Sequence, residues 1–183
     1  HGYAQGRHAP GYSGSDTQVY VASTNVLVSH AKSVALFREL KKQKVIGDKA
    51  RIGIVLVSQY YYPLDEKNPK DVEAAERGMM FDMGWFLLPI VNGDYPAVMR
   101  ERVGDRLPKF SGEESKLLKG SYDLFMLNHY GSNAVTDCDS PTSKTPCNKL
   151  QAGWAVDKAI DQTQLVPGSM QGKVDSHGND HCT

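Results

Sequence analysis

Residues 51–57 read Arg51-Ile52-Gly53-Ile54-Val55-Leu56-Val57. This run is short, almost continuously apolar and rich in β-branched side chains, which is typical of a strand. Because its apolar residues do not alternate with polar ones, we expect both faces of the strand to be buried, as in a parallel sheet that helices cover. Tyr60-Tyr61-Tyr62-Pro63 follows, and since proline cannot donate to a ladder, we expect the strand to end there.

Helical patterns flank this strand on both sides. Upstream, apolar residues recur with the 3.6-residue period of a helix, and Ser15 with Gln18 has the spacing of a capping box, so we expect a helix over residues 17–43. Downstream, Asn68-Pro69 places a cap residue before a proline in the first turn, and Asn92-Gly93 closes the apolar pattern. These two signals predict the start and the end of a second helix.

The rest of the chain carries weaker signals. A short helical piece is expected at residues 95–102, one or two further helical turns beginning at residues 111–114, and a second buried strand over residues 122–127. Residues 131–183 show little periodicity beyond a possible helical turn at 155–160, which predicts either a long functional loop or disorder. The order helix, strand, helix, strand indicates α/β architecture, although two strands alone do not make a stable sheet.

The composition restricts the classes of partner. The chain has 183 residues, of which 40% are apolar, which suffices for one hydrophobic core. Its 21 basic and 21 acidic residues cancel, so there is no electrostatic reason to expect a nucleic-acid partner. No apolar run approaches the ~18 residues of a membrane span. We therefore expect neither a nucleic acid nor a membrane as a partner.

Motifs in a fixed order along the chain carry a family resemblance. They are the loop from Gly2-Tyr3 to Pro10-Gly11, Asn25-Val26-Leu27, Ile52-Gly53-Ile54, Gly84-Trp85-Phe86, Gly93-Asp94-Tyr95-Pro96, Arg106-Leu107-Pro108 and the segment from Asp123 to Tyr130. Together, over residues 1–133, they resemble glycoside hydrolase family 1, the β-glucosidase family. The most specific part is the segment from Gly-Asp-Tyr-Pro to Arg-Leu-Pro.

The resemblance implies a partial (β/α)8 TIM barrel, from about the fourth helix to the sixth strand and the loop after it. We expect residues 1–183 to be a segment of a single glycosidase barrel domain, with a family-like core at 1–133 and a loop-rich tail at 134–183. A whole barrel needs roughly 200 residues or more. Because the sequence opens at His1 without a methionine, we expect it to have been cut from a longer chain.

The same resemblance implies the chemistry of a retaining β-glycosidase, in which two carboxylates about 5 Å apart flank the glycosidic bond. In the family, one glutamate lies in an Asn-Glu-Pro motif after the fourth strand and the other in a Glu-Asn-Gly motif after the seventh. The glutamates of this chain are Glu39, Glu66, Glu73, Glu76, Glu101, Glu113 and Glu114, and none stands in either motif. We therefore expect no catalytic residue and no cofactor here, and an isolated chain without hydrolase activity.

One part of the substrate site is expected within this chain. Asn128 and Tyr130 match the family's Asn-x-Tyr motif at the end of the sixth strand, where such barrels place functional side chains. The resemblance implies that the Tyr130 hydroxyl contacts the nucleophile carboxylate and lowers its pKa, with Asn128 beside it at the sugar subsite. Without the resemblance, Asn128 reads as a strand-end turn residue and Tyr130 as a packing aromatic. His129 replaces an aromatic common between them.

The cysteines lie in the tail. Eight residues separate Cys138 from Cys147, similar to the pinned loop of plant-type members, and a disulfide closing such a loop is worth ~3 kcal/mol. Clustered cysteines favour a secreted or lumenal location, although a cytosolic protein with three free thiols stays open. Cys182 is left for a partner outside this segment. His177 and His181 with Cys182 form a zinc-like set that we interpret as chance, so we expect no metal.

Two functions follow from these observations. The first is an internal segment of a retaining β-glucosidase-like enzyme that hydrolyses β-glucosides. The zero net charge of the chain suits such a neutral sugar substrate. Its partners would be the sugar and either the remainder of the barrel or a second copy of the chain. The alternative is a truncated, non-catalytic sugar-binding or interaction module. Turnover of an aryl β-glucoside and the apparent mass in solution distinguish these two functions.

Overall fold

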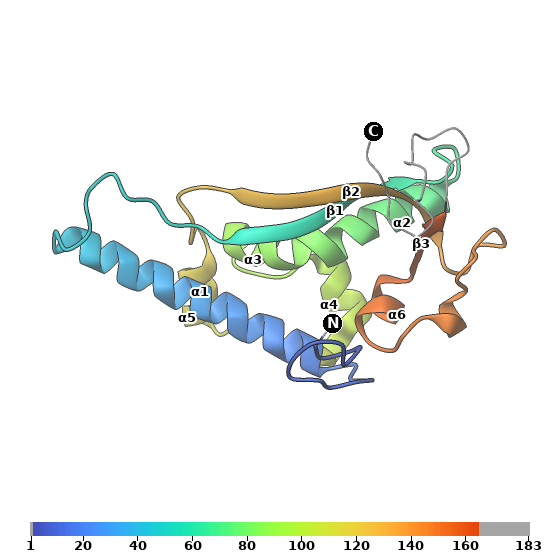
Figure 1. Cartoon of the computed structure of the whole chain (residues 1–183), viewed down its shortest axis with the longest axis horizontal. Coiled ribbons are helices and arrows are strands. Elements are labelled where there is room, and N and C mark those ends of the chain that lie inside the picture. The colour runs from blue at the N-terminus through green and yellow to red at the C-terminus, as the bar shows by residue number, and fades with distance from the viewer. Residues whose placement is uncertain (1, 165–183) are drawn as a thin grey trace, which may run out of the picture.

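The computed structural model describes residues 2–164 and shows a three-stranded sheet with helices packed on one side of it (Figure 1). In chain order the elements are α1 (Gln18–Lys42), β1 (Val55–Pro63), α2 (Pro69–Met79), the π-helical turn η1 (Met80–Gly84), α3 (Trp85–Asn92), α4 (Ala97–Val103), the 3-10 turn η2 (Gly104–Arg106), α5 (Gly112–Leu118), β2 (Met126–Asp137), the 3-10 turn η3 (Cys147–Lys149), α6 (Trp154–Lys158) and β3 (Ile160–Gln164). β1 and β2 run parallel, and β3 pairs antiparallel with β2.

The predicted helices are confirmed, with ends shifted by a residue or two. α1 begins at Gln18, whose backbone N–H donates to Ser15 Oγ at 2.9 Å, the half of the capping box that satisfies a free helix N–H. The second helix is continuous through α2, η1 and α3. Asn68 caps it by accepting the Lys70 N–H at 3.1 Å, and Gly93 ends it with φ at 91°, a left-handed conformation that favours glycine.

The expected end of the first strand is confirmed, but its expected start was wrong. β1 begins only at Val55 and runs through the tyrosines to Pro63. Pro63 is its last residue, where a missing N–H removes no bond from the strand's interior. The next donor, the Leu64 N–H, bonds to the Val135 carbonyl of β2 at 2.8 Å and continues the pairing.

The expectation that both faces of this strand are buried was also wrong. Leu56 and Ser58 are buried, whereas Val55 and Val57 are 50% and 58% exposed. α2 packs against β1 and β2 from one side, and no described helix lies on the other face (Figure 1). The apolar run is therefore suited to burial on two faces, of which this chain covers one.

The second strand is longer than residues 122–127, and the tail is more regular than its sequence indicates. β2 extends from Met126 to Asp137, so the expected boundary between residues 133 and 134 falls inside it. In the tail, α6 lies where the helical turn was expected, but β3 was not foreseen. Its register, with Thr136 opposite Asp161, comes from pairing with β2 and not from a local pattern.

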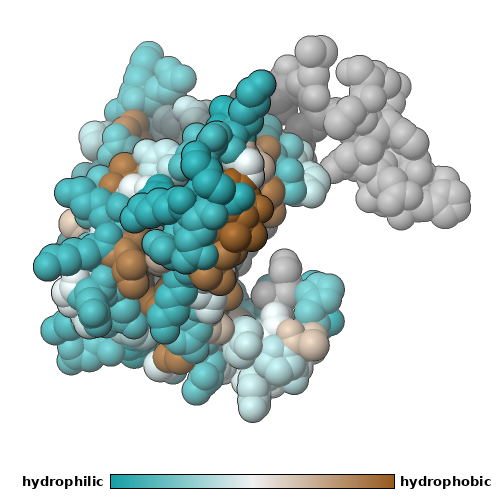
Figure 2. All heavy atoms as spheres, turned by 90° about the vertical axis from the view of Figure 1, so that its left-hand side faces the viewer, coloured by the Kyte–Doolittle hydropathy of each residue, from teal (hydrophilic) through white to brown (hydrophobic). Residues whose placement is uncertain are grey.

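Two apolar clusters hold the elements together. The larger is made by α1, η1, α3, α4 and α5 around Tyr20, Phe81 and Trp85. The smaller lies between α2 and the sheet and contains Tyr61 and Val135. A half-open apolar cavity of about 250 Å³ remains near the start of β1 and β2. Figure 2 shows hydrophobic side chains at the surface of this end of the molecule, among hydrophilic ones.

None of the helices in the described part of the chain combines the length and the apolar character that crossing a membrane requires. His177, His181 and Cys182, the zinc-like set of the sequence, lie outside the described residues.

Candidate functional site

Asn128 and Tyr130 lie on the uncovered face of the sheet. Asn128 is opposite Val57 in the parallel pairing of β2 with β1, and both side chains are exposed. Tyr130, two residues further along the same strand, is 76% exposed. Because side chains two residues apart in a regular strand point to the same face, alternation along β2 predicts that Asn128 and Tyr130 share the side away from the helices. In a closed barrel that side is the interior.

The structure revises the local setting of this pair. β2 does not end at Asn128 but continues to Asp137, so the pair lies within the strand. A break in the register between Ser58 and Tyr60 falls next to Tyr130 and leaves an extra residue in β2, a bulge that re-aims neighbouring side chains. His129 is opposite Ser58, on the other face, and so does not separate the two side chains.

The glutamates lie away from this face. Glu39, Glu73, Glu76, Glu101, Glu113 and Glu114 are on helices α1, α2, α4 and α5, and Glu66 is in the loop before α2. All are exposed except Glu114, which closes a capping box with Ser111 at the start of α5. The hydrogen bonds from Ser111 hold the pKa of Glu114 below its usual range.

A buried charge network fixes α6 against the helices. The Asp157 carboxylate accepts two bonds from the Arg106 guanidinium, at 2.9 and 2.6 Å, and one from the Tyr20 hydroxyl at 2.5 Å. The Nε of Arg102 also donates to the Asp157 carbonyl at 2.5 Å. A bidentate, charge-assisted arrangement of this kind has a defined geometry as well as a favourable energy. It ties α6 to α1 and α4.

Lys158 occupies an aromatic cage beside this network. Its side chain is 3% exposed, and its Nζ lies 3.8 Å from the ring centroid of Trp154 and 5.0 Å from that of Tyr61. The ammonium donates to Gln162 Oε1 at 3.1 Å and lies 3.4 Å from the Tyr61 hydroxyl, which itself donates to Asp82 at 3.0 Å. Burial lowers the pKa of Lys158 to about 8, against a smaller opposing effect of Asp82.

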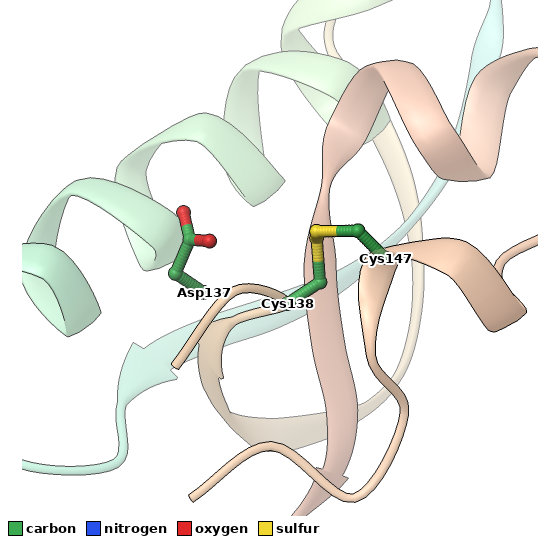
Figure 3. A group of neighbouring side chains, drawn as sticks. All are labelled: Asp137, Cys138 and Cys147. Carbon is green, nitrogen blue, oxygen red and sulfur yellow. A yellow bond between two sulfur atoms is a disulfide. The ribbon is translucent and has the colours of Figure 1, made fainter. Parts of the chain in front are cut away.

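The cysteines of the tail are joined. Cys138 and Cys147 form a disulfide with 4.9 Å between their Cα atoms (Figure 3). Asp137 lies beside them, and these three residues form a group whose potential ligand atoms lie within 4.8 Å of one another. The sulfurs are bonded to each other and the Asp137 carboxylate is paired with Arg77 at 2.7 Å, so the group as it stands does not offer the thiolates a metal needs.

Cavities adjoin the free edge of β1. One of about 400 Å³ is bounded by Val57, Trp85, Phe86, Trp154 and the carboxylate-bearing Asp82, together with residues of the N-terminal loop. A second, of about 260 Å³, lies alongside it between α1 and β1. Both border the unpaired edge of β1, because within the described residues β1 pairs only with β2. This side of the structure therefore has space along a free strand edge.

The sequence-based interpretation missed the buried charges of the tail. Asp157 and Lys158 lie in the possible helical turn at 155–160 and Asp161 just after it, and all three are buried, which the sequence did not indicate. Their partners are remote in the sequence, as with Tyr20, which is 137 residues from Asp157. Buried charges without local patterning leave no signal in a single sequence.

Comparison with known proteins gives a consistent family. The family model described as "Glycosyl hydrolase family 1" matches residues 1–170. Furostanol glycoside 26-O-beta-glucosidase of Hellenia speciosa is 39% identical over 180 residues, which is 93% of this chain and 31% of that enzyme. The chain thus spans about a third of the length of this curated relative.

Solved structures of β-glucosidases are also similar to this chain. The β-glucosidase from Trichoderma harzianum superposes with a TM-score of 0.72 at 37% identity, over 87% of this chain and 31% of that one. A β-glucosidase from the fungus Humicola insolens, determined in complex with glucose, superposes with a TM-score of 0.69 at 36% identity. This match covers 73% of the present chain and 29% of the fungal one.

Proposed function

Because the chain belongs to glycosyl hydrolase family 1, we propose that it is the part of a retaining β-glucosidase that forms one wall of the sugar pocket. The observation that carries this proposal is that Asn128 and Tyr130, an amide and a phenol two residues apart on β2, are both exposed. Such polar groups on an inward barrel face bind the hydroxyl groups of a sugar or orient a reacting carboxylate.

Covering this face completes the site. α2 already packs on the other side of β1 and β2, and the cavities along the free edge of β1 leave room for a further strand. We propose that the remainder of the barrel occupies this edge and supplies both catalytic glutamates, since the sequence of this chain holds neither glutamate motif. The 183-residue chain alone would then not hydrolyse β-glucosides.

The substrate follows from the relatives and from the charge. Those compared above are β-glucosidases by name, and one was determined with glucose. The neutral net charge of this chain suits a neutral sugar. We therefore propose a terminal β-linked glucose as the sugar whose pocket this segment lines.

A chimaera tests the proposal. Residues 2–164 replace the matching third of the Trichoderma harzianum enzyme, and turnover of an aryl β-glucoside is measured. We expect the chimaera to be active and the isolated chain to be inactive. Asn128→Ala in the chimaera should lower kcat/KM at least about tenfold, because a hydrogen bond to the substrate is lost. His129→Ala, on the other face of the same strand, is the matched control and should change kcat/KM less than twofold.

Two results would contradict the proposal. One is turnover by the isolated chain that survives the loss of Asn128 and Tyr130. The other is an active chimaera in which Asn128→Ala and His129→Ala have equal effects. If the isolated chain is inactive and yet binds glucose as a stable monomer, the sugar-binding module becomes the better description.

A further inference from the structure

We propose that the disulfide between Cys138 and Cys147 is a redox-operated clamp that seats β3 in the sheet while leaving α6 fixed. When the disulfide is closed, the loop it encloses captures the carboxylate of Asp161 on β3. When the disulfide is reduced, the loop opens and β3 separates from β2. This inference concerns the tail alone and does not depend on the catalytic role proposed above.

The capture is made by three donors inside the closed loop. The backbone N–H of Lys144 donates to Asp161 Oδ2 at 2.6 Å, the N–H of Thr145 at 3.1 Å and the Ser143 hydroxyl at 3.2 Å. Asp161 is 1% exposed, so its carboxylate depends on protein donors in place of water. Three donors from consecutive residues converge on one oxygen only while the loop keeps its present shape.

The disulfide restricts that shape. Cys138 directly follows β2, and its N–H bonds to the Ala159 carbonyl just before β3 at 3.2 Å. Cys147 begins η3 at the far end of the loop. The bond between the two sulfurs thus closes a short loop, and the first residue of this loop is already bonded to the residue before β3. This closure limits how far the donors of residues 143–145 can move away from the Asp161 carboxylate.

α6 is held by contacts that do not involve the loop. Asp157 is bound by Arg106 and Tyr20, and Trp154 donates its indole N–H to the Phe81 carbonyl at 2.9 Å. Opening the loop removes none of these bonds. Separating β3 breaks the bond from Lys158 Nζ to Gln162 Oε1, but not the bonds of Asp157 and Trp154. The tail therefore divides into a releasable part, residues 139–146 and 160–164, and a fixed part, residues 154–158.

The reduction step uses a dithiol. Its thiolate attacks the half-buried Cys147 sulfur in preference to the buried Cys138 sulfur, forming a mixed disulfide and releasing Cys138 as a thiolate that takes up a proton. The second thiol of the reagent then displaces Cys147. Two electrons and two protons pass to the protein, and the dithiol leaves as a cyclic disulfide.

Hydrogen exchange of the whole chain tests the clamp. Cys182→Ser is introduced so that thiol counting reports on Cys138 and Cys147 alone, and exchange is measured before and after dithiothreitol. We expect residues 160–164 to exchange about 100-fold faster after reduction, the factor that opening a loop of this size implies. Residues 154–158 and 126–133 should change less than threefold.

Two variants separate the clamp from general loosening. Asp161→Asn with the disulfide intact should accelerate exchange at 160–164, because the charge that collects the three donors is gone. Cys138→Ser with Cys147→Ser should match the reduced chain and no longer respond to the reagent. Unchanged exchange at 160–164 once two thiols are counted would overturn the proposal. So would equal acceleration of 154–158, or an Asp161→Asn chain that exchanges like the parent.

Discussion

At the scale of single residues, a substitution of Tyr130 distinguishes a hydrogen bond to the nucleophile carboxylate from a role in packing alone. In the chimaera, a Tyr130 hydroxyl that donates to the nucleophile carboxylate lowers the pKa of that carboxylate. Tyr130→Phe should therefore raise this pKa, move the acid limb of the kcat/KM profile to higher pH and leave the alkaline limb in place. We expect kcat/KM to fall about 10- to 100-fold, as for the loss of a hydrogen bond to a charged group.

The control for Tyr130 is Tyr122→Phe, which removes a hydroxyl from the apolar cavity near the start of β2. Its pH profile should match that of the unchanged chimaera. A Tyr130→Phe chimaera with lower activity but an unshifted acid limb would show that Tyr130 packs and does not touch the carboxylate.

Lys158 predicts how stability depends on pH. Its pKa in the folded chain is about 8, below the ~10.4 of an unfolded lysine, so between these values the unfolded chain holds a proton that the folded chain has released. Stability should therefore rise with pH across that window. The rings of Trp154 and Tyr61 favour the cation and reduce the effect, so we expect a rise of about 1 kcal/mol between pH 7 and 9.5.

Urea unfolding at several pH values measures this rise. Lys158→Met should abolish it, whereas Lys149→Met, a change at an exposed lysine of η3, should preserve it. Above pH 10 the slope reverses, because burial raises the pKa of Tyr20 and Tyr61 and the unfolded chain loses those protons first. Stability that falls steadily from pH 7 to 9.5 in the parent chain would contradict the assignment to Lys158.

Residues were predictable where a motif carried them. Asn128 and Tyr130 belong to a short pattern within one strand, so the sequence alone singles them out, and their role at the sugar subsite stays a prediction. Asp157 was not predictable, because the chemistry that keeps it buried comes from Arg106, 51 residues away, and from Tyr20 at the other end of the chain. A buried charge is tolerated only when donors from remote parts of the chain bind it, and no spacing of residues in the local sequence indicates those donors.

At the scale of elements, Gly78 sets how closely α2 approaches β1. A Cβ at this position would lie 3.0 Å from the Tyr61 ring and 3.1 Å from Ile160. Gly78→Ala gains about 1 kcal/mol in helix propensity but overpacks this contact, which costs about 1–3 kcal/mol. Since the Tyr61 ring is held by Asp82 and Lys158, we expect overpacking to win and the free energy of unfolding to fall by about 1 kcal/mol.

Gly112→Ala is the matched control, because it changes a glycine of α5 that has open space around its Cβ position. That variant should be neutral or slightly more stable in the same urea titration. If Gly78→Ala is as stable as Gly112→Ala, then α2 has room to shift and the close approach is not what fixes its position.

The sequence predicted whether most elements are helices or strands better than it predicted where the strands begin and end. Helices α1 and α2 carry their own caps and apolar faces, so their ends appear in the sequence. The ends of β1 and β2 depend on each other, as shown by Pro63, which stays in the ladder because Val135 is opposite it. The partial barrel is confirmed by the parallel pairing of β1 with β2 and by the superposition on β-glucosidases. β3 was missed because its order depends on pairing with β2 and on the burial of Ile160 against Tyr61 and Val135, which no local pattern indicates.

At the scale of the whole molecule, the uncovered sheet face determines how the isolated chain behaves. Val55, Val57 and Tyr60 are exposed on β1, whose outer edge has no partner strand among the described residues, and such an edge pairs with other chains. We expect the apparent mass in light scattering to rise with concentration. Val55→Lys with Val57→Lys should lower it towards the monomer, because charges on an edge strand oppose pairing. Val156→Lys, at an exposed apolar residue of α6, should not. A chain that stays monomeric at all concentrations would show that this face needs no cover.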